Sequence, residues 1–275
     1  MERVADTARA RALFAALPRP LGFVPTMGAL HDGHLELVAH ARLRSASVGA
    51  SIFVNPLQFG ANEDLSKYPR RPDADATKLA AAGVALLFEP GADAVYPPGF
   101  AVSIDVGPIG GVFEGAIRPG HFRGVATVIA KLLNIVRPDV LVLGQKDAQQ
   151  SVVLARTIAD LDFNVDIEVV PTIRERDGLA MSSRNAYLDT AQRAQAPTLY
   201  AALLAMREAL ERGAGKEAAV AAGKAALSTA AELDYLDLVD ASTFEPLERL
   251  RPPAFVIGAA RFGTTRLIDN IWVRQ

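Results

Sequence analysis

His31 and His34 are the side chains of this sequence best suited to act on a phosphate group. They lie on either side of Gly33, and only four histidines occur among the 275 residues. An apolar run at 21–24 precedes them, and a helical apolar pattern follows at 35–42. Free backbone N–H groups at a helix N-terminus bind anions, usually phosphate. This order of strand, glycine-bearing loop and helix predicts a phosphate site. Two locally hydrogen-bonded histidines, or half of a metal site, are the alternatives.

Two side-chain amides follow the next apolar run, 47–54. Asn55 and Gln58 come directly after this predicted strand. Ligands of open α/β sheets bind beyond the carboxyl ends of the strands, so both amides are placed to contact a ligand. An asparagine before proline also commonly starts a turn, which is the alternative role of Asn55.

Lys146 and the segment 182–184 are further candidates for binding phosphates. Lys146 follows the apolar run 139–143, and a lysine at such a place is a mobile point charge that suits a polyphosphate. The two hydroxyls and the guanidinium of Ser182, Ser183 and Arg184 can make several charge-assisted hydrogen bonds to phosphates. A solvated surface lysine and a helix cap are the alternatives.

The composition is that of an ordinary globular protein. Apolar residues make up 50% of the chain, charged residues 22%, and the formal net charge is −2. No basic tract favours nucleic acid as a partner. The absence of cysteine excludes disulfides and thiolate-bound metals and fits a reducing compartment. With no apolar run of about 18 residues and no signal-peptide pattern at the N-terminus, we expect a cytoplasmic protein without a membrane segment.

Alternating strand and helix patterns predict an α/β fold with a Rossmann-like parallel sheet, followed by a smaller α+β part. Strands are expected at 21–24, 47–54, 84–88, 101–106, 139–143 and 164–170, and helices at 1–20, from 34 onward, at 73–79 and at 125–136. After residue 187 we expect helices at 199–210 and 217–227 and strands at 235–239, 255–259 and 266–273. The predicted domains are 1–174, the catalytic domain, and 175–275, which carries the 182–184 segment.

Five segments resemble the pantoate–β-alanine ligase family, also called the pantothenate synthetases, which belongs to the HxGH nucleotidyltransferase superfamily. They occur in the family's order and read PTMGALHDGH at 25–34, NPLQF at 55–59, RPGHFRGV at 118–125, GQKD at 144–147 and DGLAMSSRN at 177–185. The last is similar to the mobile KMSKS-type loop of the superfamily. The family usually has an acidic residue where Gln145 stands. The resemblance is weakest in the first 20 residues and after Asp189.

The resemblance implies roles for individual residues. The residues implied to take part in catalysis are His31, His34, Lys146, Ser182, Ser183 and Arg184. ATP binding falls to Met27, Gly28, Ala29, Leu30, His31, Asp32, Gly33, His34, Gly144, Gln145, Lys146, Asp147, Ile173, Met181, Ser182, Ser183 and Arg184. Contacts with pantoate and β-alanine fall to Pro25, Met27, Asn55, Gln58 and Gln150. Arg118, His121 and Arg123 either frame the site or hold structure.

The same resemblance implies ATP and Mg²⁺ as cofactors, pantoate and β-alanine as substrates, and a homodimer. Asp75 is the candidate protein ligand for Mg²⁺, although the family often has two adjacent acidic residues where this chain has Ala74 and Asp75. Triphosphate oxygens and water could hold the ion instead, and Asp75 could simply cap a helix. The polar segment 61–75 could form a lid over the site.

The implied reaction joins pantoate to β-alanine through a pantoyl adenylate and releases pyrophosphate and AMP. Two other functions remain open. A nucleotidyltransferase that adenylates a phosphate substrate in cofactor biosynthesis would share the HxGH motif, but its product would keep the AMP. A non-catalytic nucleotide-binding regulator would bind ATP and release no pyrophosphate with any acid.

Overall fold

The chain forms two compact units that are not contiguous in sequence. The structure is a computed structural model that describes residues 1–60, 65–66 and 68–274. Unit 1 comprises Met1–Gly144 and Val153–Val170, and unit 2 comprises Gln145–Val152 and Pro171–Gln275. The chain therefore passes from one unit to the other at three places.

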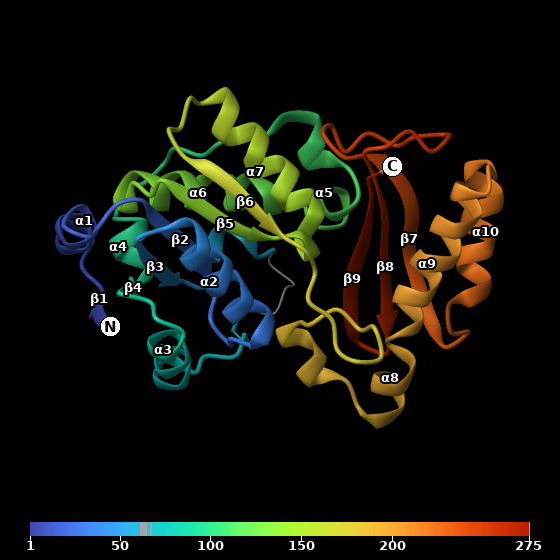
Figure 1. The fold of residues 1–275 in the computed structure, drawn as a ribbon, viewed down its shortest axis with the longest axis horizontal. Coiled ribbons are helices and arrows are strands. Elements are labelled where there is room, and N and C mark those ends of the chain that lie inside the picture. Colours follow the sequence, from blue (N-terminus) through green and yellow to red (C-terminus); the bar gives the residue numbers. More distant parts are fainter. Residues whose placement is uncertain (61–64, 67, 275) are drawn as a thin grey trace. The chain divides into compact units, whose positions relative to one another are not determined.

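Unit 1 is built on a fully parallel sheet with strand order β1-β4-β3-β2-β5-β6 (Figure 1). The strands are β1 Glu2–Val4, β2 Leu21–Thr26, β3 Ser47–Ile52, β4 Leu86–Phe88, β5 Val140–Gly144 and β6 Asp166–Val170. From β2 the chain builds outward to β3 and β4 on one side, and later to β5 and β6 on the other. The crevice beyond the carboxyl ends of β2 and β5 is thus the topological switch point, where ligands of such sheets bind.

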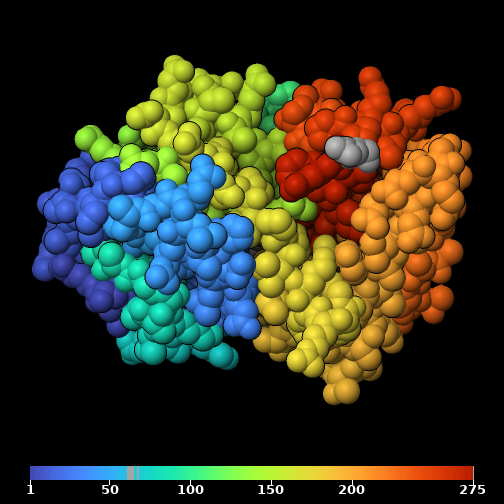
Figure 2. Space-filling model, in the orientation of Figure 1, coloured from blue at the N-terminus to red at the C-terminus, as the bar shows by residue number. Residues whose placement is uncertain are grey.

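Helices cover both faces of this sheet, as a parallel sheet requires. The cores on these faces contain residues of α1 Thr7–Ala15, α2 Asp32–Arg44, α3 Pro72–Ala81, α4 Ala92–Val95, α6 His121–Val136 and α7 Ala148–Asp160, and the short helix α5 Glu114–Ile117 precedes α6. Phe23 of β2 packs into the core formed with α1 and α6, whereas the next residue, Val24, packs into the core formed with α2 and α3. Figure 2 shows the outer sides of α2, in blue, and α3, in teal. No helix of the described ranges is long and apolar enough to cross a membrane.

Unit 2 contains an antiparallel sheet of order β7-β8-β9 packed against helices. Its strands are β7 Ala231–Asp240, β8 Ala254–Phe262 and β9 Thr265–Val273, and its helices are α8 Thr190–Gln195, α9 Thr198–Glu211 and α10 Lys216–Ala226. Leu203 and Met206 of α9 pack on Leu238 and Val256 of the sheet, and all four are almost fully buried. Short 3-10 turns lie in unit 1 at Pro56–Gln58 and Gly107–Gly111, and in unit 2 at Gln145–Asp147 and Ser183–Tyr187.

The predicted fold class is confirmed, but two predicted elements are wrong. Residues 1–20 do not form one helix, because β1 extends the sheet beside β4 and α1 begins only at Thr7. Asp6 starts α1 by accepting the N–H of Arg9 at 2.7 Å. The segment 101–106 is not a strand. Its alternating apolar pattern resembles one, but Ile104 donates its N–H to the hydroxyl of Thr127 on α6, at 2.9 Å, rather than to a strand.

Two predictions about organisation stay predictions. The division into domains at 174 and 175 differs from the compact units in two respects, because residues 145–152 and 171–174 group with the C-terminal unit. The predicted lid, 61–75, includes residues 61–64 and 67, which lie outside the described residues. The end of that segment belongs to α3.

A substitution at Gly49 of β3 tests how tightly helix α1 packs against the sheet. A Cβ at Gly49 would lie 2.4 Å from a ring carbon of Phe14, which is fully buried in α1. We predict that Gly49→Ala lowers the free energy of unfolding by about 1–3 kcal/mol, because a well-packed core resists an added methyl group. Thermal unfolding followed by circular dichroism measures the change. Gly111→Ala, where the new Cβ meets open space, is the control, and equal melting temperatures for the two variants would contradict the prediction.

Candidate active site

The loop between β2 and α2 is held in a left-handed backbone conformation by helix α3. Gly28 and Ala29 have φ angles of 86° and 53°, in a region that costs a residue with a side chain about 1–2 kcal/mol. The carboxylate of Asp75 accepts the N–H of Ala29 at 2.8 Å and that of Leu30 at 2.9 Å. Asp75 is only 2% exposed. The ammonium of Lys78 donates to the carbonyl of Leu30 at 2.6 Å, so α3 fixes the loop that leads to the histidines.

The two predicted histidines meet at the N-terminus of α2. His31 is the N-cap residue, and its carbonyl accepts the N–H of His34 at 2.9 Å. The ring centroids lie 4.1 Å apart, and the backbone N–H of His31 donates to Nδ1 of His34 at 3.4 Å. Because Nδ1 of His34 is the acceptor in this bond, the proton of a neutral His34 resides on Nε2. His34 can therefore donate a hydrogen bond through Nε2 beside a helix N-terminus.

Asn55 acts as the centre of a buried hydrogen-bond network at the end of β3. Its Nδ2 donates to Oε1 of Gln58 at 3.0 Å and to the carbonyl of Gly124 at 3.1 Å. Its Oδ1 accepts the N–H of Leu57 at 3.3 Å and the hydroxyl of Tyr96 at 2.7 Å. These four bonds match the full capacity of a side-chain amide. The geometry therefore makes Asn55 the residue that orients Gln58.

Gln58 and Tyr96 occupy opposite ends of this network. Gln58 is 8% exposed, and its Nε2 lies 3.2 Å from the sulfur of Met27, which brings two predicted substrate-binding residues together. Burial raises the pKa of the Tyr96 hydroxyl, which keeps that group protonated and donating at neutral pH. Since Oε1 of Gln58 already accepts from Asn55, its Nε2 is the end suited to donate to a ligand oxygen.

The N-terminal end of α6 supports the same turn through the backbone. Nδ1 of His121 lies 2.9 Å from the carbonyl oxygen of Gln58, and the guanidinium of Arg118 lies 3.3 Å from it. A Cβ at Gly124 would fall 2.3 Å from the carbonyl oxygen of Leu57, so only glycine allows this close approach. Arg118 and His121 thus contact the backbone of a predicted substrate-binding residue, whereas Arg123 is exposed.

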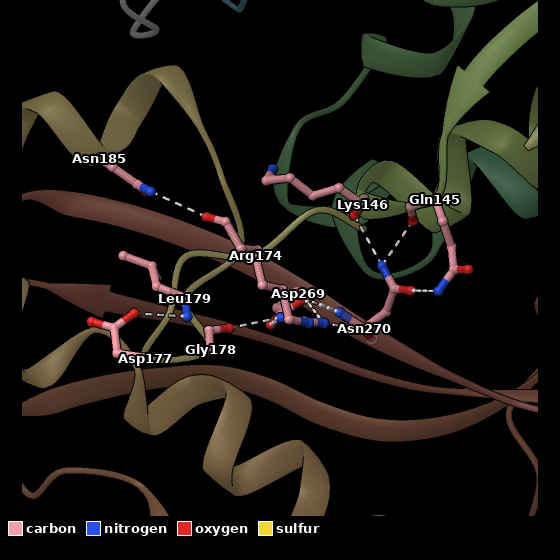
Figure 3. Close-up of polar contacts among 10 residues, drawn as sticks. Gln145, Lys146, Arg174, Asp177, Gly178, Leu179, Asn185, Asp269 and Asn270 are labelled. Carbon is pink, nitrogen blue, oxygen red and sulfur yellow. Dashed lines mark hydrogen bonds and ion pairs between the residues drawn. The ribbon is translucent and has the colours of Figure 1, made fainter. Parts of the chain in front are cut away.

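In unit 2, the turn after β5 is bonded to strand β9 (Figure 3). Asn270, on β9, donates to the carbonyls of Gln145 and Lys146 at 2.9 and 3.0 Å. The ammonium of Lys146 lies 3.8 Å from the carboxylate of Asp147. Gln150 lies further along, in the first turns of α7, and is half-buried.

The predicted mobile loop is continuous with a short hairpin in unit 2. Met181 donates its N–H to the carbonyl of Ile173 at 2.9 Å, and Arg174 and Ala180 form a β-bridge. Ser182 then caps the turn Ser183–Tyr187 by accepting the N–H of Arg184 at 3.2 Å. The cap role that the sequence left open is therefore present, at the base of the segment predicted to bind phosphate.

A pocket in unit 2 brings two of the predicted ATP-binding residues together. Lys146 and Ser182 both line a small pocket, which also borders Tyr200 and Asp269. The guanidinium of Arg174 lies 3.8 Å from the centre of the Tyr200 ring and pairs with the Asp269 carboxylate at 2.6 Å. Burial raises the pKa of Asp269, and this guanidinium opposes the shift.

The predicted residues fall into two sets, one in each unit. Unit 1 holds Pro25, Met27, Gly28, Ala29, Leu30, His31, Asp32, Gly33, His34, Asn55, Gln58, Asp75 and Gly144. Unit 2 holds Gln145, Lys146, Asp147, Gln150, Ile173, Met181, Ser182, Ser183 and Arg184. Within each unit the structure brings several of them together, and their roles in binding and catalysis stay predictions.

Sequence reasoning missed Tyr96, Arg174, Asp269 and Asn270. A signal for the last pair exists, because Asp269 and Asn270 interrupt the apolar strand 266–273 with two buried polar residues. Buried polar groups need partners, so a polar pair inside such a strand points to a specific network. Tyr96 follows a four-residue helix before an irregular stretch, and no spacing rule singles it out.

In the part of the chain that the structure describes, the surroundings of Asp75 do not fit a protein-built magnesium site. Both carboxylate oxygens of Asp75 accept backbone N–H groups, and the neighbouring Asp73 is paired with Arg3 at 3.0 Å. Within the described residues, no three side chains of His, Asp or Glu are grouped to hold a metal ion. The structure therefore assigns Asp75 to the loop.

A Rossmann-like sheet with an imidazole pair and a glycine-bearing loop at its switch point defines an α/β protein of the nucleotide-binding kind. The chain belongs to the pantoate–β-alanine ligase family, because the family model described as pantoate-beta-alanine ligase matches residues 2–272. The predicted family resemblance is confirmed.

Individual relatives agree with this assignment. The chain is 54% identical over 254 residues to a pantothenate synthetase of Acidiphilium cryptum, a match that covers 92% of this chain and 91% of the relative. The crystal structure of the pantothenate synthetase from Thermus thermophilus superposes with a TM-score of 0.95 at 49% identity, covering 100% of both chains. A pantoate–β-alanine ligase from Francisella tularensis, complexed with beta-gamma ATP and beta-alanine, gives a TM-score of 0.81 at 33% identity, covering 99% and 97% of the two chains.

Asp75→Asn tests whether α3 fixes the β2–α2 loop. The variant keeps the shape of the side chain but turns an NH₂ group toward a backbone N–H, which leaves a buried donor unpaired at a cost of about 1–3 kcal/mol. We predict that hydrogen–deuterium exchange becomes faster in peptides that cover 27–31, by about tenfold or more. Asp73→Asn is the control, since Asp73 lies on the same helix with a side chain that is 93% exposed. Unchanged exchange at 27–31 in Asp75→Asn would show that the loop is held by other contacts.

Proposed function

We propose that this protein condenses pantoate with β-alanine at the expense of ATP and forms pantothenate, AMP and pyrophosphate through a pantoyl adenylate. Family membership and the ATP- and β-alanine-bound relative from Francisella support the proposal. The observation that carries it is the segment 25–34, in which a fixed loop presents His31 and His34 at a helix N-terminus on the switch-point edge of the sheet.

In the first step, a pantoate carboxylate oxygen attacks the α-phosphorus of ATP. A new P–O bond forms, the bond to the bridging oxygen breaks, and its electron pair leaves with pyrophosphate. Negative charge builds on the oxygens around phosphorus, so fixed donors there stabilise the transition state more than the bound substrate. We assign the Nε2 proton of His34 to this task. His31, Lys146, Ser182, Ser183 and Arg184 supply further donors and positive charge to the phosphates.

In the second step, the neutral amine of β-alanine attacks the acyl carbon of the adenylate. A C–N bond forms, the C–O bond to AMP breaks with its electron pair, and the nitrogen releases a proton. Both nucleophiles come from the substrates, so the protein contributes positioning and charge stabilisation. In this proposal Gln58 and Gln150 bind the polar groups of pantoate, with Pro25 and Met27 beside them.

ATP enters this reaction as its magnesium complex, in which triphosphate oxygens and water supply the ligands that hard Mg²⁺ prefers. The proposal also includes a homodimer in the cytoplasm, as the family resemblance implies, and a first domain that ends near residue 174. Sedimentation analysis of the purified protein measures the dimer directly.

The decisive experiment incubates the protein with ATP, magnesium, pantoate and β-alanine and identifies the products by mass spectrometry. Equal amounts of AMP and pantothenate are expected, and both must depend on each of the three substrates. A product that retains AMP would instead indicate a nucleotidyltransferase that adenylates a phosphate substrate. ATP binding with no pyrophosphate release from any acid would indicate a regulator.

The Asn55 network predicts energetic coupling between Asn55 and Gln58. Gln58→Ala should raise the KM for pantoate by about tenfold or more, because polar groups of a bound substrate lose their partner. Asn55→Ala should have a similar effect by releasing Gln58 from its orientation, and the double variant should be little worse than either single one. The KM for ATP should stay within about twofold. Additive losses in the double variant would show that Asn55 and Gln58 act separately.

The role assigned to His34 predicts that its replacement slows adenylate formation, the first step, more than amide formation. Removing one donor to a transition-state charge typically costs about 100- to 1000-fold in rate, so His34→Ala should slow adenylate formation by at least about 100-fold. His31→Ala should behave similarly or more mildly. Amide formation from supplied pantoyl adenylate should suffer less, because that step begins without new charge on phosphorus. Rapid-quench measurements of the two half-reactions separate these effects.

His40→Ala is the matched control for both histidine variants. His40 lies on the same helix, where its Nε2 is 3.6 Å from the carboxylate of Glu36. Its replacement should leave both half-reactions nearly unchanged. Adenylate formation at close to the parental rate in His34→Ala would refute the assigned role, as would equal losses in both half-reactions of a folded variant.

A further inference from the structure

Two consecutive residues of strand β9, Asp269 and Asn270, are bonded to both segments of unit 2 that carry predicted phosphate-binding groups. One segment is the turn Gln145–Asp147, and the other is the hairpin that leads into Ser182 (Figure 3). Asp269 is 5% exposed and Asn270 is 2% exposed. Leaving a buried polar side chain without hydrogen bonds costs free energy. The bonds of Asp269 and Asn270 therefore fix the positions of the two segments that they contact.

Asn270 holds the lysine-bearing turn by its backbone. Its Nδ2 donates to the carbonyl oxygens of Gln145 and Lys146, at 2.9 and 3.0 Å, and its Oδ1 accepts the side-chain Nε2–H of Gln145 at 3.0 Å. A side-chain amide can donate twice and accept at the same time, which neither a carboxylate nor an apolar side chain can do. Lys146 is held through its carbonyl, so its ammonium takes no part in these bonds and is paired with the carboxylate of Asp147, at 3.8 Å.

Asp269 holds the hairpin through Arg174. Its carboxylate accepts two guanidinium N–H groups, at 2.6 and 2.9 Å, in the forked geometry that gives Arg–carboxylate pairs their directionality. The same guanidinium donates to the carbonyl of Gly178 at 3.0 Å and to that of Asn270 at 3.0 Å. Gly178 lies at the tip of the hairpin, with φ of 92°. The ion pair of Arg174 and Asp269 therefore fixes the base of the hairpin at Arg174 and its tip at Gly178. This hairpin continues into the 182–184 segment.

The two networks share one anchor. Asp269 also accepts the backbone N–H of Asn270 at 2.7 Å, and Lys146 and Ser182 line the same pocket beside Asp269. Movement of either residue on β9 would therefore change the spacing of the lysine and the hydroxyl. A polyphosphate binds several donors at once, so its affinity depends on that spacing being set before it arrives.

We propose that Asp269 and Asn270 are positioning residues for the triphosphate of ATP. They set the Lys146 turn and the Ser182–Arg184 segment at a fixed spacing without touching the nucleotide. This inference rests on the proposed function for the identity of the ligand. It assigns to the last strand of the chain a role that none of the predicted site residues has.

The test uses Asn270→Asp and Asp269→Asn in the full-length protein. Asn270→Asp puts an oxygen against the two carbonyls that Asn270 now binds, and Asp269→Asn removes the charge that pairs with Arg174. Each variant should raise the dissociation constant of ATP, measured by calorimetry without pantoate or β-alanine, by about tenfold or more. The KM for pantoate should change by less than about threefold.

Hydrogen–deuterium exchange separates positioning from a general loss of stability. Exchange should become faster at 145–148 in Asn270→Asp and at 174–184 in Asp269→Asn, with peptides of α9 and α10 unchanged. Asp234→Asn is the matched control, because Asp234 pairs with Arg266 and Arg261 in the same sheet. It should leave ATP affinity at the parental value. Should Asp269→Asn fail to fold, Arg174→Lys keeps the charge, loses the fork and gives the same readout at 174–184.

Parental ATP affinity in the folded β9 variants would overturn the proposal. So would a loss of affinity that accompanies uniformly faster exchange across unit 2. If the unaltered protein binds ATP but forms no pantothenate, the proposed function fails, and the comparison of ATP affinities still decides the role of Asp269 and Asn270.

Discussion

The burial of strand β2 at the centre of the parallel sheet is the constraint on which unit 1 depends. β2 pairs with β3 along its whole length and with β5 at its start, and its alternate side chains enter two separate cores. A strand enclosed in this way cannot shift its register by one residue without exchanging the two faces. The position of the following loop, which brings Gly28 and His31 to the sheet edge, is therefore fixed by packing rather than by the loop itself.

A second principle operates in both units: segments that carry predicted site residues are held through their main chain. Asp75 binds the N–H groups of Ala29 and Leu30, His121 contacts the carbonyl of Gln58, and Asn270 binds the carbonyl of Lys146. Each of these bonds holds a residue by its backbone and does not use its side chain. Such preorganisation lowers the cost of ordering polar groups when a charged substrate binds.

Local patterns predicted much of this architecture, and the failures have physical causes. The central strands and the helix after His31 could be predicted because apolar runs and glycines mark them. Strand β1 was missed because three residues, of which only Val4 is buried, leave almost no periodic signal. The segment 101–106 has a strand-like alternation, but only tertiary structure decides whether a pairing strand is present.

The candidate site likewise has features that local sequence predicts and features that only tertiary structure reveals. The histidine pair could be located because its spacing around Gly33 is local. The roles of Asp75 and Asn55 could not, since each depends on partners 41–69 residues away in the chain. A carboxylate that binds a loop and one that binds a metal look identical in a sequence. Only the direction of neighbouring N–H groups tells them apart.

The interleaving of the two units has a consequence for dissecting the protein. Because Gln145–Val152 belongs with the C-terminal unit while Val153–Val170 belongs with the N-terminal one, no single cut yields two self-sufficient fragments. A piece ending at Val170 would carry the Lys146 turn away from Asn270, and a piece beginning at Pro171 would lack that turn altogether. Separate expression of either half thus gives an incomplete unit. Each compact unit is made of two separate stretches of chain, and helix α7 begins in unit 2 and ends in unit 1.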